Sequence, residues 1–312
     1  MTGELLALCA LAMFSTNIVI TKVASARMSV NDGFLISVGV NLAFSALLFG
    51  VELLLRREPL HWDPYGAALF LLAGAASTYL GRWFFFEAIV RLGPAKASLF
   101  QGTSPLATIV IAWLFLGETL GAIKIAAMLV AIAGLFVVSL PPGSHRLEPG
   151  APPPPAAIPP NAGRWRAWAR SGVLVAAGSA VAYAFGNVLR GAGVRQWDEP
   201  ILGAVIGAIA GVALHLLFGS GHARVLRGLF KFDRLAVRLY ALGGVLTISA
   251  QICMIASMKY IPVAIATLIT LCTPVLVIPS SYFLLKNQEG LRGTTLAGAA
   301  LTLGGIATIL LT

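Results

Sequence analysis

The feature that most constrains this chain is a series of long apolar runs. A helix needs about 20 apolar residues to cross the hydrocarbon core of a bilayer, and ten runs of roughly that length follow one another in the sequence. They are continuous and do not alternate over about 10 residues, which excludes a transmembrane β-barrel. We expect membrane-spanning helices at roughly 4–24, 33–55, 65–90, 95–116, 119–140, 171–191, 200–219, 236–258, 263–285 and 292–312.

The composition agrees with a membrane protein. Charged residues make up 11% of the chain, against about 25% in soluble domains, which is too little to cover a water-facing surface. This excludes an ordinary cytosolic enzyme, a disordered protein and a disulfide scaffold. The net charge of +10 lies on residues between the apolar runs, so it predicts orientation in the bilayer and contact with anionic lipid rather than nucleic-acid binding.

No metal site or cofactor is predicted. Cys9, Cys253 and Cys272 all lie inside apolar runs and have no short spacing. The four histidines form no ligand pair.

A proline-rich segment divides the chain into two halves. Nine of the 17 prolines fall between Pro141 and Pro160, which is typical of an extended, semi-rigid linker. The following segment, 164–170, combines tryptophan with arginine and is expected to anchor at the membrane interface. The expected organisation is a first five-helix repeat over 1–140, a linker with an interfacial segment over 141–170, and a second five-helix repeat over 171–312.

The two halves share landmarks at a nearly constant offset of 168 to 171 residues. The matched pairs are Asn17 with Asn187, Arg91 with Lys259, Pro94 with Pro262, Pro105 with Pro274, Glu118 with Glu289, and Gly134 with Gly305. Because five is an odd number of spans, the second half enters the membrane from the opposite side. This predicts an inverted repeat around a central cavity, an architecture suited to transport by alternating access.

The same landmarks resemble the EamA-type transporters of the drug/metabolite transporter superfamily. The resemblance covers nearly the whole chain apart from the linker. It implies a ten-helix fold and export of small metabolites such as amino acids, and the bacterial aromatic amino-acid exporters are the nearest comparison. It rests on Phe14-Ser15-Thr16-Asn17, Ala88–Pro94, Pro105, Leu116-Gly117-Glu118 and Gly134, and on Phe185-Gly186-Asn187, Lys259–Pro262, Pro274 and Glu289.

Polar groups inside the spans are the candidates for substrate binding, because they are costly at membrane depth and tend to face a cavity. Arg82 is the sharpest case. It either meets a substrate carboxylate, or pairs with Glu87, or extends toward the interface. Glu87 itself is better spaced to pair with Arg91, four residues on.

The remaining candidates are polar or aromatic groups that could equally be helix packing. Pro105 and Pro274 are expected to bend their helices and form gates or cavity walls. Glu87 is the candidate for proton coupling, although facilitated export fits as well. The other substrate-binding candidates are Phe14, Asn17, Tyr79, Trp83, Gln101, Tyr183, Asn187 and Gln251.

Loop charges predict the orientation. Loops after odd-numbered spans hold 15 basic residues and loops after even-numbered spans hold five, with Arg190 counted among the five. By the positive-inside rule both termini then face outside. We expect a multi-pass protein of a bacterial-type inner membrane, a monomer or homodimer, whose partners are a small-molecule substrate and the lipid bilayer.

Two other functions remain as alternatives. A membrane enzyme acting on lipid would need a nucleophile–base pair, a metal cluster or paired carboxylates, and the sequence has no such pattern; we predict that the protein is not an enzyme. The second alternative is a lipid-carrier flippase or drug exporter of the same fold. A flippase would need a lateral opening and a basic site for the lipid headgroup, and Arg82 and Arg91 could form the basic site.

Overall fold

The computed structural model describes residues 2–28, 30–92, 100–139, 172–218, 233–273, 275–277 and 293–311. Over these ranges the chain is helical and contains no strand, which confirms the all-α prediction. Six candidate spans are long and apolar enough to cross a membrane. They are α1 (Thr2–Ser25), α2 (Val30–Leu55), the continuous segment of α3 (Pro64–Ala73), η1 (Gly74–Gly81) and α4 (Arg82–Leu92), then α9 (Gly172–Gln196), α10 (Pro200–Phe218) and α12 (Arg234–Ser257).

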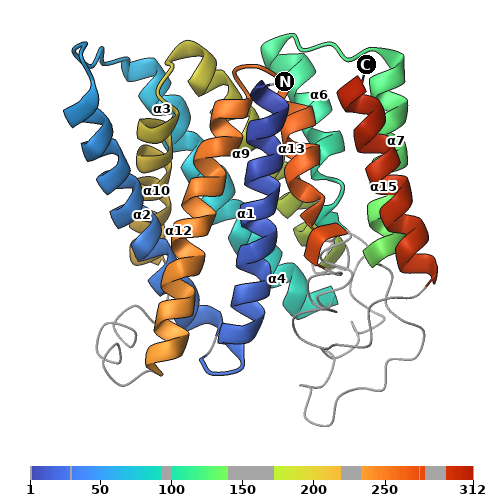
Figure 1. Ribbon diagram of the computed structural model, residues 1–312, viewed down its shortest axis with the longest axis horizontal. Helices are drawn as coiled ribbons and strands as arrows, with labels where there is room; N and C mark the ends of the chain where they lie inside the picture. Colours follow the sequence, from blue (N-terminus) through green and yellow to red (C-terminus); the bar gives the residue numbers. More distant parts are fainter. Residues whose placement is uncertain are drawn as a thin grey trace, which may run out of the picture.

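Four further apolar helices correspond to the remaining predicted spans. They are α6 (Ser104–Leu116), α7 (Ala122–Ser139), α13 (Val263–Leu271) and α15 (Gly293–Leu311). The α1 N-terminus and the α15 C-terminus lie at the same end of the bundle (Figure 1). We call this the termini end, and the opposite end, where α7 finishes and α9 begins, the linker end.

The outer surface of the bundle is apolar. Leu54 is 86% exposed, Leu217 74% and Phe115 71%. Such a surface suits lipid rather than water, which agrees with a multi-pass membrane protein.

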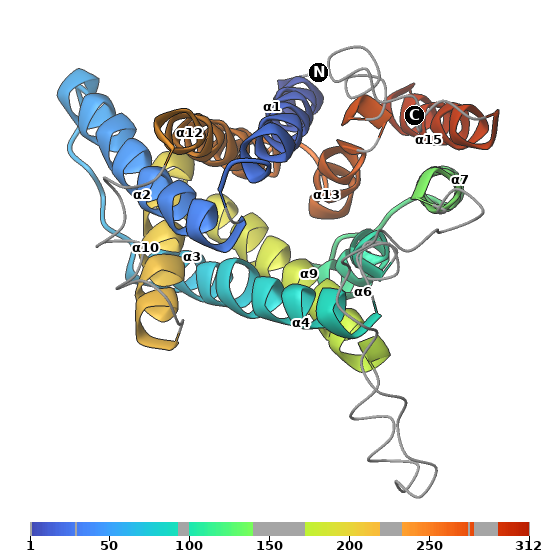
Figure 2. The same ribbon diagram turned by 90° about the horizontal axis from the view of Figure 1, so that it is seen from below.

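Small residues form the contacts between helices. α7 packs against α15 at one side of the molecule (Figure 2). There a Cβ added to Gly134 would lie 2.6 Å from the Gly298 carbonyl oxygen, and one added to Gly305 would lie 2.6 Å from that of Ala127. In a membrane, where apolar burial drives little association, such close backbone approach is the main source of helix packing.

Aspartates begin two of the spans. Asp63 precedes α3, and its Oδ1 accepts hydrogen bonds from the backbone N–H groups of Tyr65 (2.9 Å) and Gly66 (3.2 Å). Pro64 follows at the first helical position, where a missing N–H costs nothing. The other carboxylate oxygen of Asp63 accepts a hydrogen bond from Gln196 Nε2 at 3.0 Å. The bond from Gln196 has the largest effect on the pKa of Asp63, and together with the two backbone bonds it lowers that pKa. Asp233 caps α12 in the same way.

The fourth predicted span differs from expectation. A turn at residues 102–103 interrupts it, and Pro105 lies in the first turn of α6 rather than in the middle of a helix. Proline is well tolerated there because no intrahelical bond is lost. Pro105 therefore follows a break in the span instead of bending a continuous helix, and Pro274 lies outside the described residues.

Gly117 ends α6 in the left-handed region, with φ of 66°. This conformation is strained for residues with a side chain. The turn places Glu118 against α9 and α13, where it accepts from Arg195 Nη2 (2.5 Å) and from the Val263 backbone N–H (3.1 Å). Glu118 thus joins three helices at the termini end.

Candidate functional site

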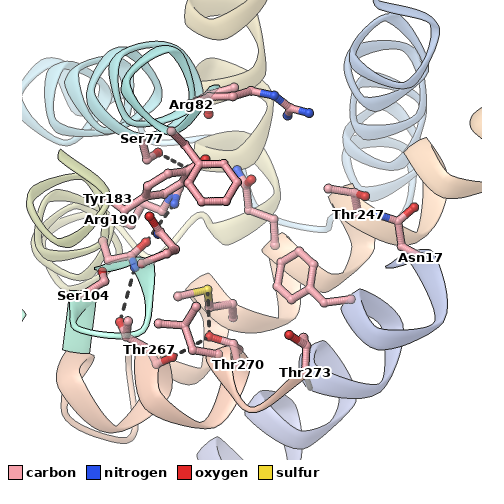
Figure 3. Close-up of a pocket in the computed structure, with 18 of the residues that line it drawn as sticks. Asn17, Ser77, Arg82, Ser104, Tyr183, Arg190, Thr247, Thr267, Thr270 and Thr273 are labelled. Carbon is pink, nitrogen blue, oxygen red and sulfur yellow. Dashed lines mark hydrogen bonds between the residues drawn. The ribbon is translucent and has the colours of Figure 1, made fainter. Parts of the chain in front are cut away.

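A cavity of about 350 Å³ lies at the centre of the bundle, between helices of both halves of the sequence (Figure 3). Asn17 and Thr247 lie on one wall, with Ser77, Tyr183 and Arg190 on the opposite one. Its size falls within the range of small-molecule sites. The lining residues are Phe14, Asn17, Ile18, Val38, Asn41, Ser77, Thr78, Arg82, Phe85, Gln101, Ser104, Tyr183, Asn187, Arg190, Thr247, Gln251, Met254, Thr267, Thr270, Leu271 and Thr273.

The structure brings most of the predicted binding candidates together at this cavity. They come from four separate helices and from the segment before α6, which sequence reasoning could not place side by side. The predicted residues that line it are Phe14, Asn17, Arg82, Gln101, Tyr183, Asn187 and Gln251.

Tyr79 and Trp83 are not among the lining residues. Tyr79 packs edge-on against His215, with ring centroids 6.2 Å apart. Trp83 is 54% exposed and contacts Phe84. Their four-residue spacing would place both on one face of an α-helix, but η1 is a π-helix up to Gly81. Its wider turns change the register before Trp83 is reached.

Arg82 begins α4 directly after η1 and lines the cavity. Its guanidinium carbon lies 3.1 Å from the centre of the Phe34 ring, a cation–π contact with α2. Glu87 pairs instead with Arg91, at 2.6 Å, as the four-residue spacing indicates. Glu87, the candidate for proton coupling, is absent from the lining.

Arg190 is the residue that the sequence analysis placed wrongly. It was counted among loop residues, but α9 continues to Gln196 and Arg190 is 7% exposed inside it. Its Nη1 donates to Asn187 Oδ1 at 2.9 Å and its Nη2 to Ser77 Oγ at 2.6 Å. Among the described residues, no carboxylate forms an ion pair with it.

Neutral polar groups hold the walls together around Arg190. Asn187 Nδ2 donates to Thr267 Oγ1 of α13 at 3.4 Å. Ser179 Oγ donates to the Gly81 carbonyl at 2.8 Å and to Gln101 Oε1 at 3.1 Å. These bonds tie α9 to η1, to α13 and to the segment before α6, so the cavity shape depends on how the helices of the two halves sit together.

Close backbone packing also places Tyr183 and Ser77. A Cβ on Gly81 would lie 2.9 Å from the Tyr183 ring, and one on Gly186 would lie 2.6 Å from Ser77 Cβ. The absence of side chains at both glycines lets α9 and η1 approach closely enough for Arg190 to reach Ser77. In the parts of the chain that the structure describes, no group of three or more His, Cys, Asp or Glu could hold a metal ion.

The EamA-like transporter family model matches residues 1–140 and 170–311. The chain belongs to this family. It is therefore a membrane transporter of the drug/metabolite transporter superfamily, in agreement with the resemblance seen in the sequence.

Comparison with solved structures supports the same fold. A structure described only as "Crystal structure of protein" superposes with a TM-score of 0.70 at 19% sequence identity, covering 99% of this chain and 98% of its own. No curated protein matches significantly.

Proposed function

We propose that this transporter exports small metabolites, amino acids among them, by alternating access through the central cavity. The observation that carries the proposal is the cavity itself. It is lined by polar groups from both halves of an otherwise apolar bundle. Polar groups at this depth are costly unless they serve a pathway, and a volume of about 350 Å³ suits a metabolite better than a lipid.

We propose that the two halves form an inverted repeat of five spans each. The packing supports this, because contacting helix pairs occur in sets related by exchange of the halves. α1 packs on α12, as α9 packs on α3, η1 and α4; α1 packs on α13, as α9 packs on α6. Exchange of the two halves would also turn each of two contacting pairs into itself. These are α7 with α15 and α6 with α13.

The interruptions beside the cavity suit a rocking motion of the two halves. Span three changes to a π-helix over Gly74–Gly81, and span four is broken at residues 102–103. Irregular turns of this kind are frequent at functional sites. Because both interruptions border the cavity, we infer that small rotations there would change its access to the two sides of the membrane in turn.

The orientation follows from charge. With Arg190 moved into the membrane and Lys124 in the first turn of α7, the connections and helix ends at the termini end hold five basic residues, against 15 that the sequence assigns to the linker end. Three of the five are paired with acids: Arg56 with Glu199, Arg195 with Glu118, and Lys259 with Asp198. This favours a cytoplasmic linker end and termini outside, in a bacterial-type inner membrane.

We favour facilitated export over proton coupling through Glu87. A coupling carboxylate must lie in the pathway, and the described lining holds no Asp or Glu. Glu87 also already pairs with Arg91.

The test is counterflow in proteoliposomes with a panel of labelled amino acids and no imposed ion gradient. We expect uptake of some members, and we expect Arg82→Ala to abolish transport of carboxylate-bearing substrates while the protein stays folded. Exposed Arg57, changed to Ala, is the matched control and is expected to transport normally. No uptake of any member by folded protein would contradict the proposal.

A further inference from the structure

The cavity has a strong charge imbalance. Arg82 and Arg190 both line it, and no described lining residue is acidic. The remaining polar groups are amides and hydroxyls. We propose that the substrate is a small organic anion with two acidic groups, or with more acidic than basic groups. This inference rests on the proposed transport function and narrows its substrate class.

Arg190 is a buried cation whose hydrogen-bond partners are neutral. A buried cation without a counter-ion is expensive, because its lost hydration is not repaid by an opposite charge. The groups that Arg190 binds, Asn187 and Ser77, are both neutral. They use two of the five N–H donors that a guanidinium offers. A carboxylate or phosphate on the substrate would supply both the missing charge and a pair of oxygen acceptors for the remaining donors.

The two arginines lie at different depths along their spans. Arg82 starts α4, in the half of its span nearer the linker end, whereas Arg190 lies in the final two turns of α9, nearer the termini end (Figure 1). Tyr183 lines the cavity together with both arginines, and Figure 3 shows Tyr183 beside Arg190 with Arg82 beyond it. A molecule with two acidic groups can therefore engage both guanidinium groups.

Neutral amino acids fit this charge distribution less well. Their carboxylate would find an arginine, but their ammonium group would face two like charges and only neutral oxygens. A cationic amino acid would add further repulsion without any described acidic partner in the lining. The expected order of affinity is dianion first, then monoanion, zwitterion and cation.

The experiment measures binding to the purified full-length protein with ligands matched in size but not in charge. The probes are succinate, glutamate, glutamine and lysine at constant ionic strength, and the readout is the rise in Tm with concentration. We expect succinate and glutamate to stabilise the protein with at least tenfold lower half-saturating concentrations than glutamine, and lysine to have no effect. Loss of one hydrogen bond to a charged group typically weakens binding by about tenfold or more.

Arg190→Gln tests the assignment at the residue. It should reduce the preference for glutamate over glutamine about tenfold, and Arg190→Lys should keep part of it. Arg57→Gln removes the same charge from an exposed position and should leave the preference unchanged. If Arg190→Gln fails to fold, the ligand series on the unaltered protein still decides the question.

Equal or better stabilisation by glutamine than by glutamate overturns the inference, and so does the absence of any effect of the two acids. The proposed function has a separate test. Counterflow of neutral amino acids would keep the transporter proposal while removing the anion preference, and absence of counterflow with every substrate would remove both.

Discussion

The contact between α7 and α15 allows a matched test of how this bundle is held together. A Cβ added to Gly305 would lie 2.6 Å from the Ala127 carbonyl oxygen and 2.8 Å from both Cβ and N of Ala131. Its neighbour Gly304 has no atom within 4 Å of the same added carbon. A glycine-to-alanine substitution therefore adds a methyl group to a close backbone contact at Gly305 and to open space at Gly304.

The size of the expected loss of stability follows from these distances. Gly305→Ala must push α7 and α15 apart by roughly 1 Å, and a gap of 0.5–1 Å already loses a quarter to a half of the dispersion attraction at a contact. It would also stretch the bond from Thr302 Oγ1 to the Ala131 carbonyl, now 3.4 Å. We expect a loss of about 1–3 kcal/mol, as for overpacking elsewhere. Gly304→Ala should instead gain up to about 1 kcal/mol from helix propensity.

The assay is thermal unfolding of the two variants and the unaltered protein in the same detergent. The readout is the fraction of protein that stays monodisperse after heating. Gly305→Ala should have the lowest Tm and Gly304→Ala a Tm at or above that of the unaltered protein. Equal Tm values for the two variants would refute the idea that this small-residue contact stabilises the bundle.

Three further predictions concern the packing and the ends of the spans. Gly74→Ala should lower Tm and transport together, because its Cβ would lie 2.4 Å from the Gly207 carbonyl, whereas Gly207→Ala meets only ordinary contacts and should be tolerated; similar Tm values would contradict this. Glu118→Gln should cost about 1–2 kcal/mol by weakening the charged bond to partly exposed Arg195, measured as a lower Tm than that of the exposed control Glu58→Gln. Because hydrogen bonding lowers the pKa of Asp63 in the folded protein, its contribution is present above the pKa of an unfolded aspartate, about 3.9, and is lost as pH falls further; Asp63→Asn, which still caps α3, should have a flatter Tm profile between about pH 5 and 3, and an unchanged profile would count against the cap.

Hydropathy and spacing predicted the all-helical fold because membrane helices must satisfy their backbone hydrogen bonds within an apolar segment. The repeat also indicated Asn17 and Asn187, which occupy matching positions and both line the cavity. Substrate-binding roles for these residues stay predictions.

Two features of the site were not predicted from the sequence. Arg190 was counted as a loop residue at the end of a span, since charge usually ends an apolar run. Its spacing of three residues from Asn187 was the signal that could have placed both on one helix face. The π-helix η1 has no comparable sequence rule, so the ordinary α-helical period does not predict which way Tyr79 and Trp83 face.

Transport by alternating access requires one cavity to open in turn to each side of the membrane. The most direct test is a single cysteine at Thr247, which lines the cavity, in a chain whose three native cysteines are replaced. A membrane-impermeant thiol reagent is then applied separately from each side in oriented vesicles. We expect labelling from both sides, with substrate slowing both reactions. Labelling from one side alone, with or without substrate, would contradict it.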